Sequence, residues 1–237
     1  MTQPRAGGWD LRLPASAHTS QPWRIHDLTG DFRLEDVWAL PTPGGKDDFG
    51  LLMRLLTSRD GPLLTSSSRS VRVLWAARKA LGRVFGWDDA PAGRDSAGYD
   101  SAGYDTAAYN TEREMLRDRL PDDIASGGGD QGLRMAPFTT LYLLHDEWAA
   151  ELVNRTMHGV IHIGWVQDGS GGYRGQLAVL VKPNGLLGAA YMAAIKPFRH
   201  LIVYPLALRQ TERAWRRRLP AALVDDLAGH DRQVNLC

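Results

Sequence analysis

The hydrophobic pattern of the first half of the chain predicts mainly helices. Apolar residues with helical spacing predict short helices near 34–39 and over 49–57. Over 71–85 they recur every three or four residues, which predicts a longer amphipathic helix with a basic polar face. Thr111, followed three residues later by a glutamate, forms a capping box and predicts a helix that ends at Leu120.

In the second half of the chain the pattern changes to an alternation of apolar and polar residues, the period of a β-strand. Residues 138–144 and 157–166 are predicted strands, whereas 148–156 fits a strand or a helix. A glycine-rich turn at 168–172 leads to a further strand over 173–182, which predicts a hairpin. One face of the strand before that turn carries Met157, Gly159, Ile161, Ile163 and Trp165.

A long helix over 186–219 closes the pattern, and Pro197 and Pro205 are expected to kink or split it. Its residues are largely apolar before Leu208 and polar or basic after Arg209. Such a helix must bury its apolar face, and the preceding strands supply the surface. The sequence therefore predicts an α+β domain in which an antiparallel sheet packs on a long C-terminal helix.

Charge and cysteine content narrow the class of protein. The 28 basic and 27 acidic residues leave a net charge of +1, a balance that implies neither nucleic acid nor an anionic membrane as a partner. The lone cysteine, Cys237, excludes an internal disulfide and fits a reducing compartment. Residues 1–15 lack the apolar core of a signal segment, and no stretch is long enough to cross a bilayer. We therefore expect a cytoplasmic protein without stable membrane insertion.

Composition also predicts the domain organisation. Residues 1–22 are polar and rich in Gly, Pro and Ser, and are expected to form a partly ordered arm. One domain then spans 23–219, with a flexible loop inserted at 88–111 that contains a threefold repeat of five residues over 95–109. Residues 220–237 are expected to form a tail. The sequence leaves the oligomeric state open, a homodimer included.

Several stretches resemble an uncharacterised bacterial domain family: Ser16–His18, Trp23–Ile25, Asp31–Trp38, His145–Val166, Ala178–Met192 and Ile195–Pro205. That family is similar to the START-like, or helix-grip, superfamily, which includes polyketide cyclases, plant allergen-type hormone binders and lipid-transfer domains. The resemblance implies a curved antiparallel sheet wrapped around the C-terminal helix, and such a sheet leaves a cavity suited to apolar ligands. It brings no catalytic residues with it.

Three functions follow as expectations. The first is a binder of an apolar, polyketide- or lipid-like metabolite in the cavity between the sheet and the C-terminal helix. The second is a cofactor-free cyclase or isomerase acting on such a metabolite in secondary metabolism, since positioning a flexible chain can itself accelerate its cyclisation. The third is a regulatory or interaction module. No cofactor, metal or nucleic acid is expected in any of them.

Three residues are candidates for catalysis. His158 and His162 lie four apart, which on a strand separates them by about 13 Å, too far for one metal ion. They share the face opposite Ile161, and in a pocket either could act as a general acid or base. Glu151 on a neighbouring strand could pair with one of them; an ordinary buried ion pair is the alternative. The histidines either line the cavity or lie at the surface or edge of the sheet. Gly159 and Gly164 suggest close approach on the other face and slightly favour the cavity.

A second set of polar and aromatic residues is expected to line the ligand cavity. Tyr191 and Tyr204 lie in the C-terminal helix and could offer hydroxyl groups to a ligand, although core packing with a wet tip is commoner. Arg199 follows Pro197 and could instead satisfy carbonyls freed by the kink. The predicted ligand-binding residues are Tyr191, Trp165, Asn154, Arg199, Tyr204 and Trp148.

Overall fold

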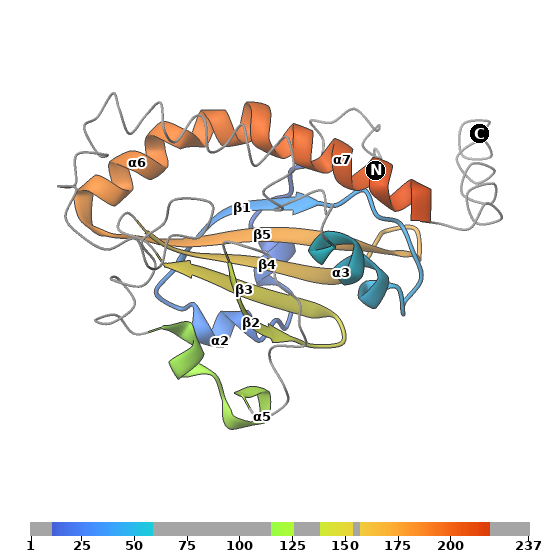
Figure 1. Cartoon of the computed structure of the whole chain (residues 1–237), viewed down its shortest axis with the longest axis horizontal. Coiled ribbons are helices and arrows are strands. Elements are labelled where there is room, and N and C mark those ends of the chain that lie inside the picture. Colours follow the sequence, from blue (N-terminus) through green and yellow to red (C-terminus); the bar gives the residue numbers. More distant parts are fainter. Residues whose placement is uncertain (1–10, 59–114, 126–137, 154–156, 219–237) are drawn as a thin grey trace, which may run out of the picture.

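The computed structural model describes residues 11–58, 115–125, 138–153 and 157–218 (Figure 1). The predicted helix over 71–85, the repeat loop, the tail after 219 and the candidate Asn154 lie outside the described residues.

A curved, wholly antiparallel sheet of five strands forms the centre of the fold, in the order β1-β5-β4-β3-β2 (Figure 1). The predicted strands and the hairpin between the two longest of them are confirmed, and the ambiguous stretch is a strand rather than a helix. The strands are β1 (Arg33–Ala39), β2 (Thr139–Leu143), β3 (Glu147–Val153), β4 (Met157–Gln167) and β5 (Tyr173–Pro183).

The short helix expected near 34–39 is wrong, because these residues form β1, which pairs with β5. The register shifts between Leu34 and Asp36, so a bulge disturbs the alternation that marks a strand. In addition, Asp36 to Ala39 are all buried. A strand buried on both faces gives a continuous apolar run, which periodicity alone does not separate from a helix.

The C-terminal part of the chain is one continuous helical rod. It consists of α6 (Gly185–Phe198), the π-helical segment η2 (Arg199–Val203) and α7 (Tyr204–Arg218). The predicted interruption is present, but it takes the form of the π-helical segment between Pro197 and Pro205, and no break in the chain's helical path occurs. In Figure 1 the rod lies nearest to β1 and β5, whereas α2 and α5 lie near β2 and β3.

The rod and α3 (Phe49–Thr57, as predicted) pack on one face of the sheet, which we call the rod face. Its core is rich in large aromatic residues, and two of their indole groups also anchor the loop after β1. Trp165 Nε1 donates to the Gly45 carbonyl at 3.0 Å, and Trp215 Nε1 donates to the Pro43 carbonyl at 2.9 Å. The core includes Trp38, Leu40, Leu52, Leu56, Trp148, Ile161, Ile163, Trp165, Leu177, Tyr204, Leu208 and Trp215.

Short helices cover the opposite face, which we call the histidine face. They are α1 (Ser16–Thr19), α2 (Ile25–Leu28), η1 (Leu116–Arg119) and α5 (Asp122–Ala125). Their apolar residues form a second core with Leu141, Tyr142, Ala149, Val160, Val166, Ala178 and Leu180. The helix predicted to end at Leu120 is, in its described part, the single 3₁₀ turn η1.

Residues 11–22 were expected in a partly ordered arm, yet they run beside the sheet. The Leu13 amide donates to the Val37 carbonyl at 2.8 Å, and the Ala39 amide donates to the Leu11 carbonyl at 2.7 Å. These bonds lay the segment along the outer edge of β1 and bring α1 over the histidine face, where His18 is buried. Of the helices in the described ranges, none has the length and apolarity needed to traverse a bilayer.

Candidate functional site

His158 and His162 project from β4 onto the histidine face, away from the rod. Val160 and Val166 lie on the same face of β4 as the two histidines and pack in the core under α2. Ile161 and Ile163 lie on the opposite face and pack under the rod. The expectation that the two histidines line a space between sheet and C-terminal helix is therefore corrected. Gly164 misled that expectation: it shares the face of His162, and a Cβ on it would lie 2.5 Å from the Trp23 ring.

Each histidine forms a pair with a glutamate of β3. His162 Nε2 lies 2.9 Å from Glu147 Oε2, and His158 Nε2 lies 2.7 Å from Glu151 Oε2. The register places Glu147 opposite Gly164 and Glu151 opposite Val160, so each carboxylate is diagonal to a histidine two residues along β4. The pairing of Glu151 with a histidine is as the sequence suggested.

Glu147 is a site residue that sequence reasoning missed. The signal was present in the spacing: glutamates at 147 and 151, and histidines at 158 and 162, are both four apart. On paired antiparallel strands, equal spacings repeat the same diagonal contact. Only the register shows which glutamate meets which histidine.

From His162 a series of rings leads outward through α1 and α2. His18 Nε2 lies 3.1 Å from His162 Nδ1, and His26 Nε2 lies 3.2 Å from His18 Nδ1. Adjacent rings meet nearly edge to face. His162 and His18 are fully buried, whereas His26 is half-buried. We call the series His26–His18–His162–Glu147 the histidine relay.

The buried end of the relay is a carboxylate held by several donors. The Tyr142 hydroxyl donates to Glu147 Oε2 at 3.0 Å, and the Arg24 amide donates to Oε1 at 2.9 Å. Burial alone would raise the pKa of Glu147, but the hydrogen bonds from His162, Arg24 and Tyr142 outweigh it and lower that pKa. Burial, with Glu147 beside it, raises the pKa of Tyr142. Glu147 is therefore ionised and Tyr142 is a neutral donor.

The two buried imidazoles are neutral at neutral pH. Burial, reinforced by the neighbouring His162 and His26, lowers the pKa of His18 to about 3. Burial also lowers the pKa of His162, although the hydrogen bond to Glu147 opposes it. A neutral imidazole donates from one ring nitrogen and accepts at the other, whereas an imidazolium only donates. Neutral rings are thus what a continuous series of hydrogen bonds requires.

The carboxylate fixes the tautomer of every ring in the relay. Ionised Glu147 only accepts, so His162 donates from Nε2 and accepts at Nδ1. His18 then donates to it from Nε2 and accepts at Nδ1, and His26 donates from Nε2 in turn. In its neutral form, His26 can then accept a proton at Nδ1, at the outer end of the series. The relay therefore joins a half-buried base to a buried carboxylate.

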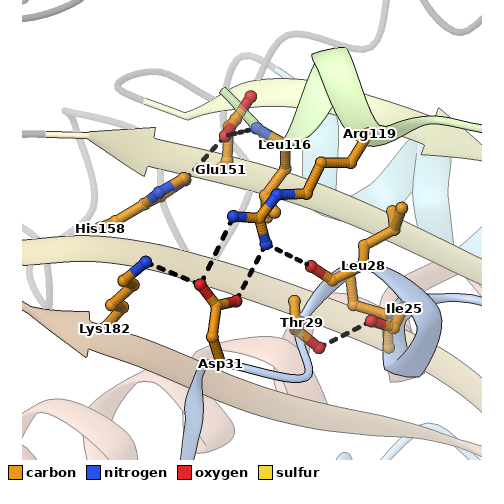
Figure 2. Close-up of polar contacts among 9 residues, drawn as sticks. All are labelled: Ile25, Leu28, Thr29, Asp31, Leu116, Arg119, Glu151, His158 and Lys182. Atoms are coloured by element: carbon orange, nitrogen blue, oxygen red, sulfur yellow. Dashed lines mark hydrogen bonds and ion pairs between the residues drawn. The ribbon is translucent and has the colours of Figure 1, made fainter. Parts of the chain in front are cut away.

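The second pair, His158–Glu151, lies under a covering segment tied down by polar contacts (Figure 2). Glu151 Oε2 also accepts the Leu116 amide at 3.0 Å. The Phe32 ring packs edge-on against His158. Outside it, Asp31 accepts from Arg119 at 2.9 Å and Lys182 at 2.6 Å, and these hydrogen bonds lower its pKa. This pair serves to fasten η1 to the sheet.

Of the predicted ligand-binding residues, the four whose side chains the structure describes lie at the rod face. Trp148, Trp165 and Tyr204 lie together in its core, and the side chain of Tyr191 lies outside the described part of α6. Arg199 Nη2 and the Tyr204 hydroxyl both donate to Asp36 Oδ2, at 2.7 and 2.8 Å. These two groups are thus engaged with a buried carboxylate of β1.

Asp36 is the second residue that sequence reasoning missed. His200 Nε2 contacts its Oδ1, so Asp36 is surrounded by three side chains from the rod. We call Asp36, Arg199, His200 and Tyr204 the Asp36 cluster. Burial, with Asp36 beside it, raises the pKa of Tyr204 well above its usual value, which leaves Tyr204 a neutral donor. The cluster holds η2 against β1.

Metal binding has no support in the ranges that the structure describes, where no group of three or more His, Cys, Asp and Glu side chains is arranged to hold an ion. In the relay the ring nitrogens of His18 and His162 point at each other, so they do not converge on a common point.

Comparison with known proteins places the chain in a family whose function is unknown. Residues 28–206 match a family described as a protein of unknown function, DUF2867. The chain belongs to this family. No curated protein and no solved structure matches it. The DUF2867 match includes Tyr142, Glu147 and His162, the inner end of the relay, whereas His18 and His26 precede the matched region.

Proposed function

We propose that this DUF2867 protein is a cofactor-independent acid–base catalyst that moves a proton on a small polyketide- or lipid-like metabolite, as an isomerase or cyclase. The observation that carries the proposal is the histidine relay, in which three imidazoles in series connect a half-buried ring to a buried carboxylate. Structural polar groups need partners, but they do not need to alternate donor and acceptor along a path to the surface.

The relay lets His26 act as a base without creating a buried cation. His26 Nδ1 takes a proton from a carbon beside the substrate's carbonyl, and its Nε2 proton passes to His18 Nδ1. His18 passes its Nε2 proton to His162 Nδ1, and the His162 Nε2 proton moves onto Glu147. The C–H electron pair stays on the substrate as an enolate. Reversal of the series returns a proton to a different carbon, which completes an isomerisation.

The neutral state of the buried rings supports this proton path. The low pKa of His18 keeps its ring neutral from neutral pH down to about 3, so the series of donors and acceptors stays intact. Each hydrogen bond joins buried or half-buried groups, where a low local dielectric strengthens it. Because the negative charge leaves Glu147 as it forms on the substrate, net charge is conserved across the site.

The direct test is hydrogen–deuterium exchange at the α-carbon of β-ketoacyl thioesters in D₂O, followed by proton NMR. We expect the wild-type protein to accelerate exchange, and His26→Gln or His162→Gln to lower the rate by about 100-fold or more. His158→Gln is the matched control, because it is also a buried histidine of β4 paired with a glutamate, and it should retain the rate. Equal rates in the wild-type protein and in folded His26→Gln would contradict the proposal.

A second candidate function, binding of an apolar metabolite between the sheet and the rod, rests on a different observation. The indole N–H groups of Trp38 and Trp148 are buried in the rod-face core and have no hydrogen-bond partner within the described residues. A carbonyl or hydroxyl oxygen of a ligand would satisfy them. Native mass spectrometry should then detect a retained molecule that Trp148→Phe loses; identical spectra would argue against this binder.

The START-like assignment belongs with this second candidate as a proposal. It is supported by an antiparallel sheet with the closing helix packed on one face. The short helices that cover the histidine face are an addition to that plan. The relay lies under this addition, so the acid–base proposal does not depend on the START-like assignment.

A further inference from the structure

The outward side of the rod is divided into an apolar half and a basic half. The outward residues of α6 and η2 are apolar with one charged exception, the exposed Lys196: Leu186 is 91%, Leu201 59% and Ile202 39% exposed. Between Gly185 and Ile195 the helix contains no charged residue, and its alanines at 189, 190, 193 and 194 are exposed. The other side of the same helix is buried through Met192 and Ile195.

The second half of the rod's outward side is basic. In α7 the arginines at 209, 213, 216, 217 and 218 are all exposed. Arg209, Arg213 and Arg217 recur every four residues and therefore follow one side of the helix. The single acidic residue in α7 is Glu212, which accepts from Arg216 at 2.9 Å. The buried side of α7 is formed by Leu208, Trp215 and their neighbours.

Helix stability explains only part of this distribution. Basic residues in the last turn interact favourably with the carbonyl end of a helix, which accounts for Arg216 to Arg218. That effect decays within one turn and does not reach Arg209. Single exposed apolar residues are normal on protein surfaces, but Leu201 and Ile202 are adjacent, and the helix before Lys196 is uncharged from Gly185 to Ile195.

We propose that the outward side of the rod is a peripheral docking surface for an anionic bilayer. The apolar half would lie at the boundary of headgroups and acyl chains, and the arginines would contact anionic headgroups. The charge complementarity is local: α7 contributes five arginines and one glutamate in a chain whose net charge is only +1. This surface docks on a membrane without spanning it and is independent of the relay, which lies on the other face of the sheet.

The test compares vesicles of phosphatidylcholine with vesicles that also contain phosphatidylserine, by co-sedimentation of the full chain. We expect binding to the anionic vesicles only, weakened by added salt. Arg213→Gln with Arg217→Gln should weaken binding about 25-fold, since each arginine near an anionic leaflet strengthens it about fivefold. Leu201→Ser with Ile202→Ser should weaken it about tenfold. Arg33→Gln, on β1 with a side chain 76% exposed, is the control and should bind as the wild-type protein does.

All four substituted side chains are exposed, so both double variants should fold, which their thermal unfolding would verify. Absence of binding to anionic vesicles, or equal binding to both kinds, would overturn the proposal. Loss of binding in the arginine variant with full binding in the Leu201–Ile202 variant would also overturn it, because it would identify a surface for a polyanion, such as an acidic protein, in place of a bilayer.

Discussion

The two faces of the sheet bury polar groups in opposite ways. On the rod face, one carboxylate, Asp36, is surrounded by three side chains that all come from the rod. On the histidine face, the polar groups stand in series, and each connects to the next across four elements: α2, α1, β4 and β3. A convergent cluster locks one helix in place. A series with an open outer end can also pass a proton.

The difference shows how structural and chemical polar networks can be told apart within one fold. In the Asp36 cluster three side chains converge on one carboxylate, and they do not form a series that leads outward. In the relay each inner ring is donor and acceptor at once, and its tautomer is fixed by the carboxylate beyond it. The first arrangement is expected to contribute stability, and the second to contribute proton transfer.

The largest expected effect is on the convergent cluster. Asp36→Ala would leave the Arg199 guanidinium and the Tyr204 hydroxyl buried without their acceptor, and should destabilise the fold by about 3–5 kcal/mol. Urea unfolding followed by tryptophan fluorescence measures this. Glu35→Gln is the neighbouring control: its ion pairs are long, 3.8 to 4.0 Å, and its cost should stay below about 1 kcal/mol. If both variants lost only a small and similar amount of stability, the Asp36 cluster would not be what holds the rod against β1.

The pH dependence of stability should identify the relay. Unfolded His18 binds a proton below about pH 6.5, whereas folded His18 does so only near pH 3, so the unfolded state holds more protons between those values. The free energy of unfolding should therefore fall as pH is lowered from about 6.5 towards 3, by on the order of 4 kcal/mol from this group.

Carboxylates with lowered pKa values, such as Glu147, also lose stabilising interactions in acid, so the wild-type curve alone is not diagnostic. His18→Gln removes one titrating group and should flatten the curve over the same pH range relative to the wild-type protein. Superimposable curves for the two proteins would show that His18 is not held neutral by the fold.

A smaller loss of stability should distinguish how tightly the two faces of the sheet are covered at Gly159 and Gly164 of β4. In Gly164→Ala the new Cβ would lie 2.5 Å from the ring of Trp23, between α1 and α2, so Trp23 must shift, at a cost of about 1–3 kcal/mol. In Gly159→Ala the nearest atoms are 3.4 and 3.5 Å away, at the end of the flexible Met157 side chain, and the cost should be smaller. Chemical unfolding of both variants gives the comparison, and an equal cost would mean that Trp23 is loosely seated.

The sequence was sufficient for elements with a regular period and insufficient where the register decides. The alternation over 157–166 identified β4 and its two faces correctly, as did the apolar spacing over 49–57 for α3. It failed at β1, where a bulge and burial on both faces remove the alternation. The alternation of side chains along β4 placed His162 and Ile161 on opposite faces of the sheet. It does not indicate which helices cover each face.

The site could be predicted only in part for the same reason. Pairing of Glu151 with a histidine followed from neighbouring strands, whereas the Glu147–His162 contact depends on the register of β3 against β4. His18 and His26 lie in or beside a stretch whose Gly, Pro and Ser content suggested an arm, and only backbone bonds to β1 bring it over the sheet. Asp36 gave no signal, because its partners follow more than 160 residues later.

The most direct test of the relay is nitrogen-15 NMR of the histidine side chains in the full-length protein at neutral pH. The ring nitrogen shifts report protonation and tautomer, and His26→Gln, His18→Gln and His162→Gln would assign them. We predict that His18 and His162 are both neutral and both carry their proton on Nε2, with Nδ1 as the acceptor. An imidazolium at either position, or a proton on Nδ1 of either ring, would contradict the account.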